Sequence, residues 1–369
     1  MKYYIIAGEA SGDLHGSNLM KALFKKDSKA EIHFWGGDLM QQSGGTLIKH
    51  YKELSFMGFI EVLMNIGTIF KNISFCKKDI AEFKPDVIIF IDYSGFNLRI
   101  AKWAKQQGYS TNYYISPQVW ASRVGRVKKI KRDIDTMYVI LPFEEAFYKK
   151  HGYKVTFVGH PLIDAIADIK SVDEQQFRKT HQLTHQPIIA LLPGSRKQEI
   201  AKMLSIMLKM VDKFKDYQFV IAGAPSQDFE FYQSFIKNSN VKFIQNKTYD
   251  LLSISYAALV TSGTATLETA LFKVPQVVCY KGSAISYQIA KRIITIKFIS
   301  LVNLILDKEI VTELIQNDFN EKKLNQELTK ILDDKHREQL FLEYVELEKI
   351  LGGKGASEKT AGLIVSSLR

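Results

Sequence analysis

Cysteine is scarce in this sequence, which has only Cys76 and Cys279 among its 369 residues. Two cysteines so far apart exclude a disulfide framework and a cysteine-based zinc site, and they favour a reducing, cytoplasmic setting. Prolines number only eight, and hydrophobic residues make up 46% of the chain while charged residues make up 24%. A disordered or repetitive chain is therefore excluded, and two domains of about 150 to 200 residues each are expected.

Long hydrophobic runs are missing as well. The amino-terminal run "YYIIAGEA" is much shorter than the core of a signal peptide, and it contains an acid. The most apolar later segment, residues 284–306, is interrupted by Lys291, Arg292 and Lys297, which a membrane-spanning helix tolerates poorly. The sequence therefore predicts no transmembrane span.

Acidic residues are outnumbered: 50 lysines and arginines against 39 acids give a formal net charge of +11. Such a surface favours an anionic partner, which leaves nucleic acid, a phosphorylated substrate and an anionic membrane open. Six of the basic residues lie between Arg123 and Arg132, in a run that is usually a solvated helix face. No nucleic-acid-binding motif accompanies this run, so we expect no nucleic-acid partner.

What is present is an alternation of apolar strand-like runs with amphipathic helical stretches, which predicts an α/β fold with parallel sheets. Ligands gather at the carboxyl ends of parallel strands, so two Rossmann-like lobes are expected to face a central cleft. Strands of the first lobe are predicted at residues 3–7, 32–35, 87–92, 111–115 and 137–141. The predicted divisions are a first lobe over 1–167, a polar linker over 168–186, a second lobe over 187–350, and a final helix over 351–369 that closes back on the first lobe.

The first turn, "AGEASGD", follows the first predicted strand and lacks the GxGxxG spacing of a dinucleotide site. Its acids would repel a pyrophosphate. We expect Glu9, Ser11 and Asp13 to exchange hydrogen bonds with sugar hydroxyls instead. Helix capping alone would also explain Asp13.

Asp92 in "IIFIDYSGFN" follows five apolar residues, so it is expected at the end of a strand. Desolvation there would raise its pKa and make it a better general base, although an acid that caps the next helix has the same pattern. The later stretch "YYISPQVWASR" also ends a predicted strand. Gln118 and Trp120 in it are suited to the face of a sugar, and packing is an equally good reading of Trp120.

The second lobe has two turns that favour phosphate. In "LLPGSRKQEI", Gly194, Ser195 and Arg196 stand between a predicted strand and a helix, where backbone N–H groups and a guanidinium bind anions. The second turn, "TSGTATLETAL", offers Ser262, Gly263 and Thr264, followed by Glu268 for the ribose hydroxyls. Two such turns in one lobe predict a nucleotide diphosphate. The alternatives are an ordinary strand-to-helix turn at the first motif and a solvated helix acid at Glu268.

The segment Phe56 to Phe70, "FMGFIEVLMNIGTIF", has one charge, Glu61, in fifteen residues. This is too apolar for a helix with one buried face. It predicts a patch that enters lipid or holds an acyl chain, and a helix buried on all sides is the alternative. Metal sites are not expected, because Asp133 and Asp135 in "DID" precede a predicted strand and His181 and His185 lack a third ligand.

Taken together, the motifs resemble those of the lipid A disaccharide synthase family. The motifs are "AGEASGD", "FMGFIEVL", "IDYSGFN", "SPQVWA", "LPFE", "VGHPLID", "LLPGSR", "SGTATLE" and "SLVNLIL". The resemblance implies a two-lobed GT-B fold, with UDP bound in the carboxyl-terminal lobe. It also implies an inverting transferase that joins UDP-2,3-diacylglucosamine to 2,3-diacylglucosamine 1-phosphate through a β(1→6) link. The family needs no metal or cofactor and acts peripherally at the inner membrane, through the segment Phe56 to Phe70 and basic residues here.

The resemblance assigns roles to particular residues. Asp92 matches the family's essential aspartate, which is proposed as the base, and Arg196, Glu268 and Asn303 match nucleotide-side and active-site positions. Glu9, Ser11 and Asp13 match the first-lobe turn. Two departures are Gly95, where many relatives have a second acid, and Val302, where they have proline. Gly95 leaves Asp92 as the stronger single candidate for the base. Val302 affects the local backbone and therefore the orientation of the Asn303 side chain.

Three questions stay open from the sequence. A homodimer is one, and the separate roles of Glu9, Asp13 and Glu61 are another. The third is activity: an epimerase of UDP-N-acetylglucosamine shares the paired lobes, and a membrane- or RNA-docking protein with an inert nucleotide fold would use the basic run. The apolar segment and the order of the motifs argue against the first rival, and Asp92 and Arg196 argue against the second.

Overall fold

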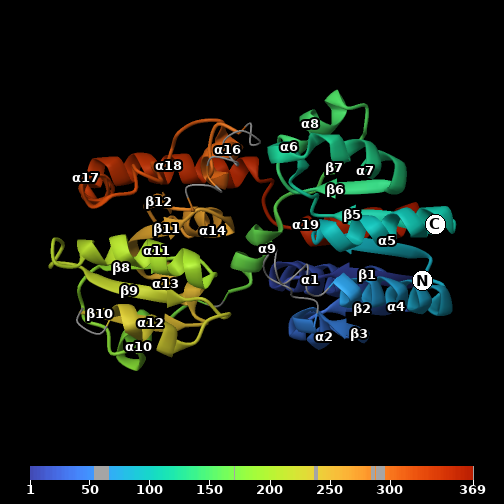
Figure 1. The fold of residues 1–369 in the computed structure, drawn as a ribbon, viewed down its shortest axis with the longest axis horizontal. Helices are drawn as coiled ribbons and strands as arrows, with labels where there is room; N and C mark the ends of the chain where they lie inside the picture. The colour runs from blue at the N-terminus through green and yellow to red at the C-terminus, as the bar shows by residue number, and fades with distance from the viewer. Residues whose placement is uncertain (54–65, 170, 237–239, 284–286, 288–295, 369) are drawn as a thin grey trace. The chain divides into compact units, whose positions relative to one another are not determined.

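The computed structural model describes residues 1–53, 66–169, 171–236, 240–283, 287 and 296–368. The chain divides into two compact units (Figure 1). The first unit comprises Met1–Ala167 together with Leu351–Arg369, and the second comprises Asp168–Ile350. Both termini therefore belong to the first unit.

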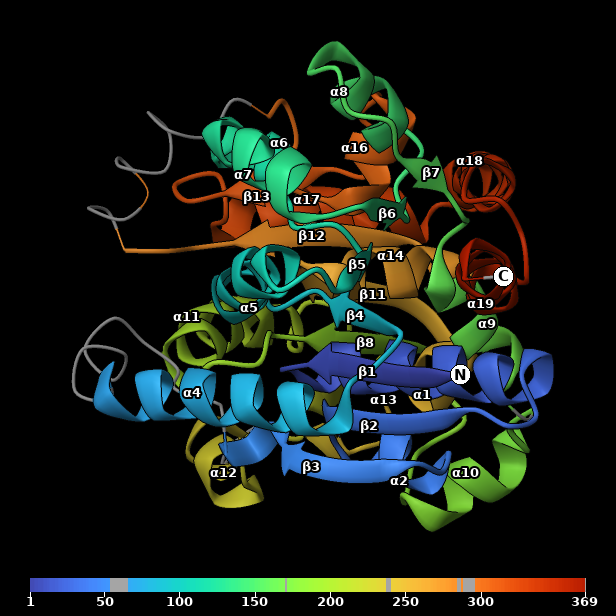
Figure 2. The same cartoon turned by 90° about the vertical axis from the view of Figure 1, so that its right-hand side faces the viewer.

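The first unit is built on a seven-stranded sheet in which all neighbours are parallel, in the order β3-β2-β1-β4-β5-β6-β7 (Figure 2). All five residues of β4 are buried, as expected for a parallel strand covered on both faces. The strands are β1 Lys2–Ala7, β2 Glu31–Gly36, β3 Thr46–His50, β4 Val87–Ile91, β5 Ser110–Tyr114, β6 Thr136–Val139 and β7 Thr156–Phe157.

Helices cover this sheet. The apolar core on one face joins Tyr4 and Phe90 of the sheet to Cys76 and Ile100 of two helices. The carboxyl-terminal helix packs against α1 and α9, which ties the two ends of the chain together. The helices are α1 Ala10–Lys26, α2 Asp38–Gln42, α4 Ile66–Phe83, α5 Ser94–Gln106, α6 Val119–Ser122, α7 Val127–Asp133, α8 Glu144–Lys150, α9 Pro161–Ala167 and α19 Ala356–Ser367, with 3-10 turns η1 Tyr51–Glu53 and η2 Val124–Arg126.

Polar contacts fix the carboxyl-terminal helix on the first unit. The Asp164 carboxylate accepts hydrogen bonds from the backbone N–H groups of Gly355 (2.6 Å) and Ser357 (3.1 Å), which satisfies the start of α19. Lys25 of α1 forms an ion pair with Glu358 at 2.6 Å. Residues 351–369 are thus integrated into the unit that the first 167 residues form.

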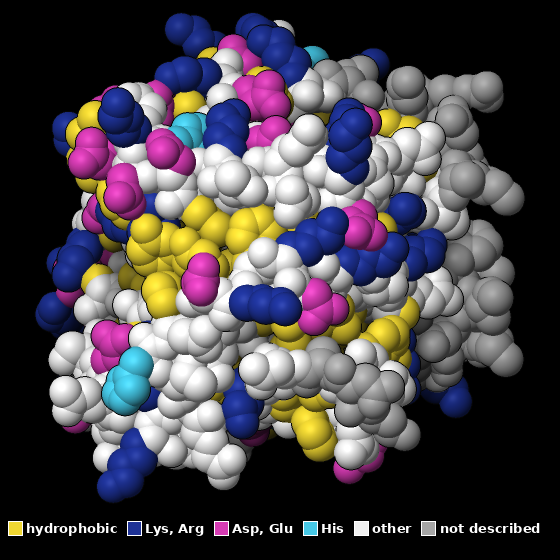
Figure 3. Space-filling model, turned by 90° about the vertical axis from the view of Figure 1, so that its left-hand side faces the viewer, with side chains coloured by type: hydrophobic (Ala, Val, Ile, Leu, Met, Phe, Trp, Pro, Cys, Tyr) yellow, Lys and Arg dark blue, Asp and Glu magenta, His cyan; other side chains and the backbone are white. Residues whose placement is uncertain are grey.

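The second unit repeats the plan with a six-stranded parallel sheet, in the order β10-β9-β8-β11-β12-β13. Its strands are β8 Ile188–Leu192, β9 Gln218–Gly223, β10 Val241–Gln245, β11 Ser255–Thr261, β12 Gln276–Tyr280 and β13 Glu313–Ile315. Its helices are α10 Glu174–Thr180, α11 Lys197–Met207, α12 Phe229–Ile236, α13 Thr248–Ser253, α14 Thr264–Leu271, α16 Leu301–Leu306, α17 Glu321–Leu332 and α18 Asp334–Ile350, with the 3-10 turn η3 Leu208–Met210. Figure 3 shows hydrophobic and basic side chains together on one face of this unit.

The segment predicted as a linker, residues 168–186, is more ordered than its composition indicates. Asp173 caps α10 by accepting from the backbone N–H of Gln176 at 3.0 Å. Phe177 is buried in the apolar core of the second unit, together with Ile188 and Val260. Val172 and Leu183 of the same segment also pack against this core, so apolar residues on both sides of α10 hold it on the second unit.

The apolar segment lies largely outside the described residues, which resume at Ile66 where α4 begins. Glu61, Met57 and Phe59 are therefore not described. Along α4, the side chains of Phe70 and Phe75 are 63% and 47% exposed. None of the described helices is long and apolar enough to cross a bilayer.

Candidate active site

The strand order of the first sheet reverses between β1 and β4, and ligands bind at the carboxyl ends of strands at such a point. Ala7 and Ile91, the last residues of these two strands, are paired in register. The loop after β1 carries Glu9 and Ser11, both exposed, and half-buried Asp92 follows β4. Three residues predicted from the sequence therefore lie at adjoining strand ends.

Asp92 has an unusual backbone conformation. Asp92 and Tyr93 have φ angles of 43° and 44°, both in the left-handed region that side chains rarely adopt. The Asp92 carbonyl accepts hydrogen bonds from Asn97 Nδ2 at 2.8 Å and from Tyr113 Oη. Both partners are fully buried. Asn97 and Tyr113 thus support this turn, and the sequence reasoning did not single out either one.

The environment of Asp92 makes its carboxylate more basic. Burial, and then the negative charge of Glu9, raise the pKa of Asp92 to about 6, while the backbone N–H of Tyr93 opposes the shift. Glu9 can affect the pKa of Asp92 because the turn after β1 closely approaches the turn after β4. A Cβ on Gly8 would lie 2.2 Å from Cδ1 of Tyr93, so only glycine fits there. A Cβ at Gly95, by contrast, would have no described atom within 4 Å.

Asp13, predicted to contact sugar, is only 3% exposed. Its carboxylate accepts from the backbone N–H groups of Gly37 (2.7 Å), Met40 (3.0 Å) and Leu39 (3.1 Å). These bonds join α1 to the start of α2 and occupy both carboxylate oxygens. The contacts are those of a structural residue, and the predicted sugar contact stays a prediction.

The segment after β5 contains two more predicted sugar residues, Gln118 as the N-cap residue of α6 and Trp120 within α6. Gln118 is exposed, whereas Trp120 is only 9% exposed and packs edge-on against Phe143, with ring centroids 5.0 Å apart. Beneath this segment lies Glu144, a buried acid that the sequence reasoning passed over although it belongs to the "LPFE" motif. Its Oε1 accepts from Ser116 Oγ at 2.7 Å, and burial raises its pKa to about 7.

The second sheet reverses its order between β8 and β11, and the two predicted phosphate turns follow these two strands. In the turn after β8, Gly194 adopts a φ of 105°, and the Ser195 carbonyl accepts from Ser226 Oγ at 2.9 Å. Arg196 follows as the N-cap residue of α11. Its side chain is exposed and has no hydrogen bond or ion pair within the described ranges.

The turn after β11 is held in a similar way. Ser262 is half-buried, and its Oγ donates to the carbonyl of Ile299 at 2.8 Å. Gly263 and Thr264 are exposed where α14 begins, and Gly263 has a φ of 154°. Exposed backbone at a helix start, next to the reversal point, is a favourable place for an anion.

Glu268, one turn into α14, lines a cavity of about 430 Å³. Tyr249 Oη donates to its Oε1 at 2.8 Å, and burial raises the pKa of Glu268 above its ordinary value. The sequence pattern did not indicate Tyr249, because it lies nineteen residues earlier on another helix. The cavity is lined by Ile169, Pro225, Asn246, Lys247, Thr248, Tyr249, Asp250 and Glu268.

Asn303, predicted as an active-site residue, has a fully buried side chain. Its Nδ2 donates to the Val311 carbonyl at 2.8 Å and to Glu313 Oε1 at 2.9 Å. Its Oδ1 accepts from the backbone N–H groups of Ile310 (2.8 Å) and Val311 (3.0 Å). The amide thus joins α16 to the segment before β13, which is a positioning role, and its contact with substrate stays a prediction.

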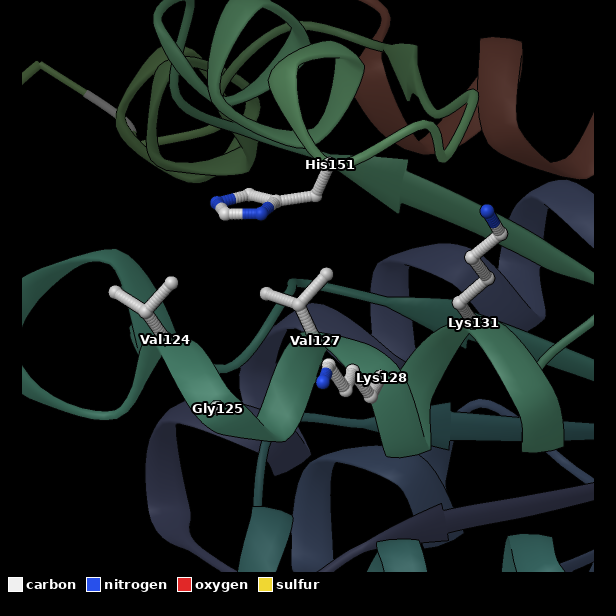
Figure 4. A pocket seen from close by; sticks show the side chains of 6 residues that line it. All are labelled: Val124, Gly125, Val127, Lys128, Lys131 and His151. Carbon is white, nitrogen blue, oxygen red and sulfur yellow. The ribbon is translucent and has the colours of Figure 1, made fainter.

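A second cavity, of about 390 Å³, lies in the first unit between α7 and the residue that follows α8 (Figure 4). The side chains of Val124 and Val127 point toward the ring of His151. Lys128 and Lys131 line the same cavity. Part of the basic run is therefore a concave, partly apolar surface and not only a solvated helix face.

Among the described residues, no three histidine, cysteine, aspartate or glutamate side chains lie together in a way that could hold a metal ion. His15 and His160 are buried, and burial lowers the pKa of each, to about 4 and about 3 respectively. Both cysteines are free and buried.

Comparison with known proteins agrees with this picture. A family model described as lipid-A-disaccharide synthetase matches residues 3–361. A lipid-A-disaccharide synthase of Geobacter metallireducens is 37% identical, with 99% of this chain and 96% of that protein covered. One from Syntrophus aciditrophicus is 38% identical, with coverage of 99% and 97%.

Solved structures with the same fold are more distant in sequence. The UDP-GlcNAc 2-epimerase of Neisseria meningitidis, bound to UDP-GlcNAc, has a TM-score of 0.67 at 13% identity, and 100% of this chain and 99% of that chain are covered. The Methanocaldococcus jannaschii UDP-GlcNAc 2-epimerase, in complex with UDP-GlcNAc and UDP, has a TM-score of 0.66 at 14% identity over the whole of both chains. This likeness confirms the predicted α/β fold of the GT-B type.

Proposed function

This chain belongs to the lipid-A-disaccharide synthase family, and on that premise we propose which reaction its residues carry out. A glycosyltransferase of lipid A biosynthesis is the activity that the family gives. The proposed substrates are UDP-2,3-diacylglucosamine as donor and 2,3-diacylglucosamine 1-phosphate as acceptor. The proposed products are the β(1→6)-linked disaccharide 1-phosphate and UDP.

The observation that carries the proposal is the half-buried carboxylate of Asp92 at the reversal point of the first sheet. Its pKa of about 6 leaves it ionised at neutral pH yet more basic than an ordinary aspartate. Asp92 removes the proton from the acceptor 6-hydroxyl as that oxygen attacks the donor C1. UDP leaves from the opposite face, so the configuration at C1 inverts. Exposed Glu9, Ser11 and Gln118 are the proposed sugar contacts.

The second unit is proposed to bind UDP. Arg196 carries an exposed guanidinium that is unpaired within the described ranges, and the helix starts at Lys197 and Thr264 offer backbone N–H groups to the pyrophosphate. These groups meet the charge that develops on the leaving diphosphate, which is the work of a divalent ion in other transferases. Glu268 and Tyr249, which line the 430 Å³ cavity, are the proposed acceptors of hydrogen bonds from the ribose hydroxyls.

The test is an assay of UDP release with both substrates, with and without the acylated acceptor, in the presence of EDTA. A lipid A disaccharide synthase releases UDP only when the acceptor is present, and a metal-independent one does so in EDTA. Release without acceptor, or isomerised UDP-sugar as the product, would favour an epimerase-like enzyme. No turnover of the donor under any condition would favour a docking protein.

Membrane association is a separate part of the proposal. The apolar segment runs from residue 56 into α4, where Phe70 is 63% exposed, and Lys128 and Lys131 line the 390 Å³ cavity of the same unit. Apolar side chains enter the interface while cations attract anionic headgroups, so the two features favour peripheral binding to the inner membrane from the cytoplasm.

Flotation with vesicles that contain phosphatidylglycerol tests this part. Phe70→Glu is expected to weaken flotation, as are Met57→Glu and Phe59→Glu in the undescribed segment. Leu342→Glu is the matched control, because Leu342 is 67% exposed on the other unit. Equal flotation of Phe70→Glu, Leu342→Glu and the parent protein would contradict a membrane role for the segment.

Homodimer formation stays a prediction.

A further inference from the structure

Three arginines follow two neighbouring strands of the first sheet. β4 and β5 are paired in parallel, so the segments after them begin at the same edge of the sheet. Arg99 lies on α5, after β4, whereas Arg123 and Arg126 lie after β5, around η2. The crossover brings the two segments together, because α5 packs against α7, which continues directly from η2.

The three guanidinium groups are close enough to influence one another. Arg99 Nη1 donates to the Gly95 carbonyl, so this side chain bends back over the first turn of α5, next to the Asp92 turn. Burial, and then the positive charges of Arg123 and Arg99, lower the pKa of Arg126. The three arginines, called the arginine cluster below, thus lie on segments that pack against each other.

Tyr113 connects this cluster to the proposed base. Its hydroxyl donates to the Asp92 carbonyl. Burial and the charge of Asp92 raise the pKa of Tyr113, and Arg126 opposes that rise. Arg126 therefore lies within electrostatic range of a ring that contacts the Asp92 turn, and the cluster and the turn are neighbours.

The cluster has no acid of its own. Within the described ranges, the arginines that form ion pairs are Arg132 and Arg178, so none of the three guanidinium groups has an acidic partner. Like charges gathered without a counter-charge repel one another, and a bound anion removes this cost. Guanidinium groups match phosphate oxygens with two parallel hydrogen bonds each, so a phosphate monoester with two negative charges suits three arginines.

We propose that Arg99, Arg123 and Arg126 form the subsite that holds the phosphate of the acceptor while Asp92 receives the proton of its 6-hydroxyl. This inference rests on the proposed function. In a glucosamine 1-phosphate, C1 and C5 both bond to the ring oxygen, and C5 carries the 6-hydroxymethyl group. The phosphate and the reacting hydroxyl therefore flank one edge of the sugar, and neighbouring loops can hold both.

The experiment compares kcat/KM for the acceptor with that for the same diacylglucosamine without its phosphate. Arg126→Ala is expected to lower kcat/KM roughly 10- to 100-fold for the phosphorylated acceptor, which is typical of lost charge-assisted hydrogen bonds, and to change it little for the other. Arg123→Ala is expected to act in the same direction. The matched control is Lys129→Ala, which removes one exposed positive charge from α7 and should affect both acceptors equally little.

The rate with the unphosphorylated acceptor reports folding and proton removal, so it separates recognition from damage. Equal losses on both acceptors in Arg126→Ala, or no loss on either, would overturn the subsite. Failure of the parent protein to form any disaccharide would refute the proposed function instead. The subsite then has its own readout: titration calorimetry with glucosamine 1-phosphate, in which binding by the parent and by Lys129→Ala but not by Arg126→Ala supports it, and equal binding by all three overturns it.

Discussion

The two units share one architecture but differ in the charge at the point where their strand order reverses. In the first unit the loops after β1 and β4 present Glu9 and Asp92, and among the described residues the side-chain charge that shifts the pKa of Asp92 is the negative charge of Glu9. In the second unit the loops after β8 and β11 present Arg196, Ser262 and exposed backbone at two helix starts. Directly at the reversal point, the same sheet topology thus presents acids in one unit and a guanidinium with exposed backbone donors in the other, because the loop residues and not the strands decide the chemistry.

The largest expected effect comes from removing the carboxylate of Asp92 in the first unit. Asp92→Asn keeps the size of the side chain but removes the base, so we expect kcat to fall roughly 100- to 10,000-fold, the range typical of a lost general base. The measurement is disaccharide formation with saturating substrates. Glu82→Gln, which removes an exposed acid from α4, is the control and should be near normal. A rate for Asp92→Asn within a few-fold of the parent would exclude Asp92 as the base.

The second largest effect comes from removing the guanidinium of Arg196 in the second unit. Arg196→Ala removes one preorganised donor to the leaving diphosphate, and we expect a loss of about 3 kcal/mol in transition-state stabilisation, roughly a hundredfold in rate. The melting temperature should stay unchanged, because the Arg196 side chain is exposed and unpaired in the described part of the chain. Lys197→Ala, one residue further along α11, is the charge-matched control. Near-normal turnover by Arg196→Ala would contradict the assignment.

A third change separates stability from chemistry at Asn303. Asn303→Ala leaves the Val311 carbonyl and two backbone N–H groups without partners in a buried place, at a cost of about 1 to 3 kcal/mol for each group left unsatisfied. We expect a clearly lower midpoint in urea unfolding. A variant with parental stability and a large loss of kcat would show instead that Asn303 acts on substrate.

The smallest effect sharpens the description of the first unit. The rate should fall as the pH drops through about 6, where Asp92 takes up a proton. Glu9→Gln removes a negative charge that raises the pKa of Asp92, so the acid limb of the kcat profile should move to lower pH. Ser11→Ala is the control and should leave the limb in place. An acid limb unmoved by Glu9→Gln would show that burial alone sets this pKa.

Much of the fold was predictable because it rests on patterns along the chain. The run before Asp92 is β4, Val87–Ile91, and its uninterrupted apolar residues indicated a strand buried on both faces. The strands Thr46–His50 and Thr156–Phe157 were not predicted, since both are only partly buried and one has two residues. The helix within residues 168–186 was also missed, because the apolar residues that hold it, Val172, Phe177 and Leu183, are few and widely spaced in a polar segment.

The candidate site was predictable only in part. The position of Asp92 followed from the strand that precedes it, and that of Arg196 followed from the turn. The support of Asp92 by Tyr113 was not visible, because the two residues are 21 positions apart and meet through sheet pairing. The backbone partners of Asp13 were not visible for a similar reason, since Gly37 lies 24 positions further along.

The sequence by itself determined the family, the two α/β halves and the residue types at the strand ends, because periodicity and local motifs are properties of neighbouring residues. Only the tertiary structure decided which polar groups are free for a ligand and which are already used. Asp13 and Asn303 accept hydrogen bonds from distant backbone, whereas Arg99, Arg123 and Arg126 form no ion pair within the part of the chain that the structure describes. The physical reason is that hydrogen-bond and charge balance depends on groups that folding brings together from far apart in the chain.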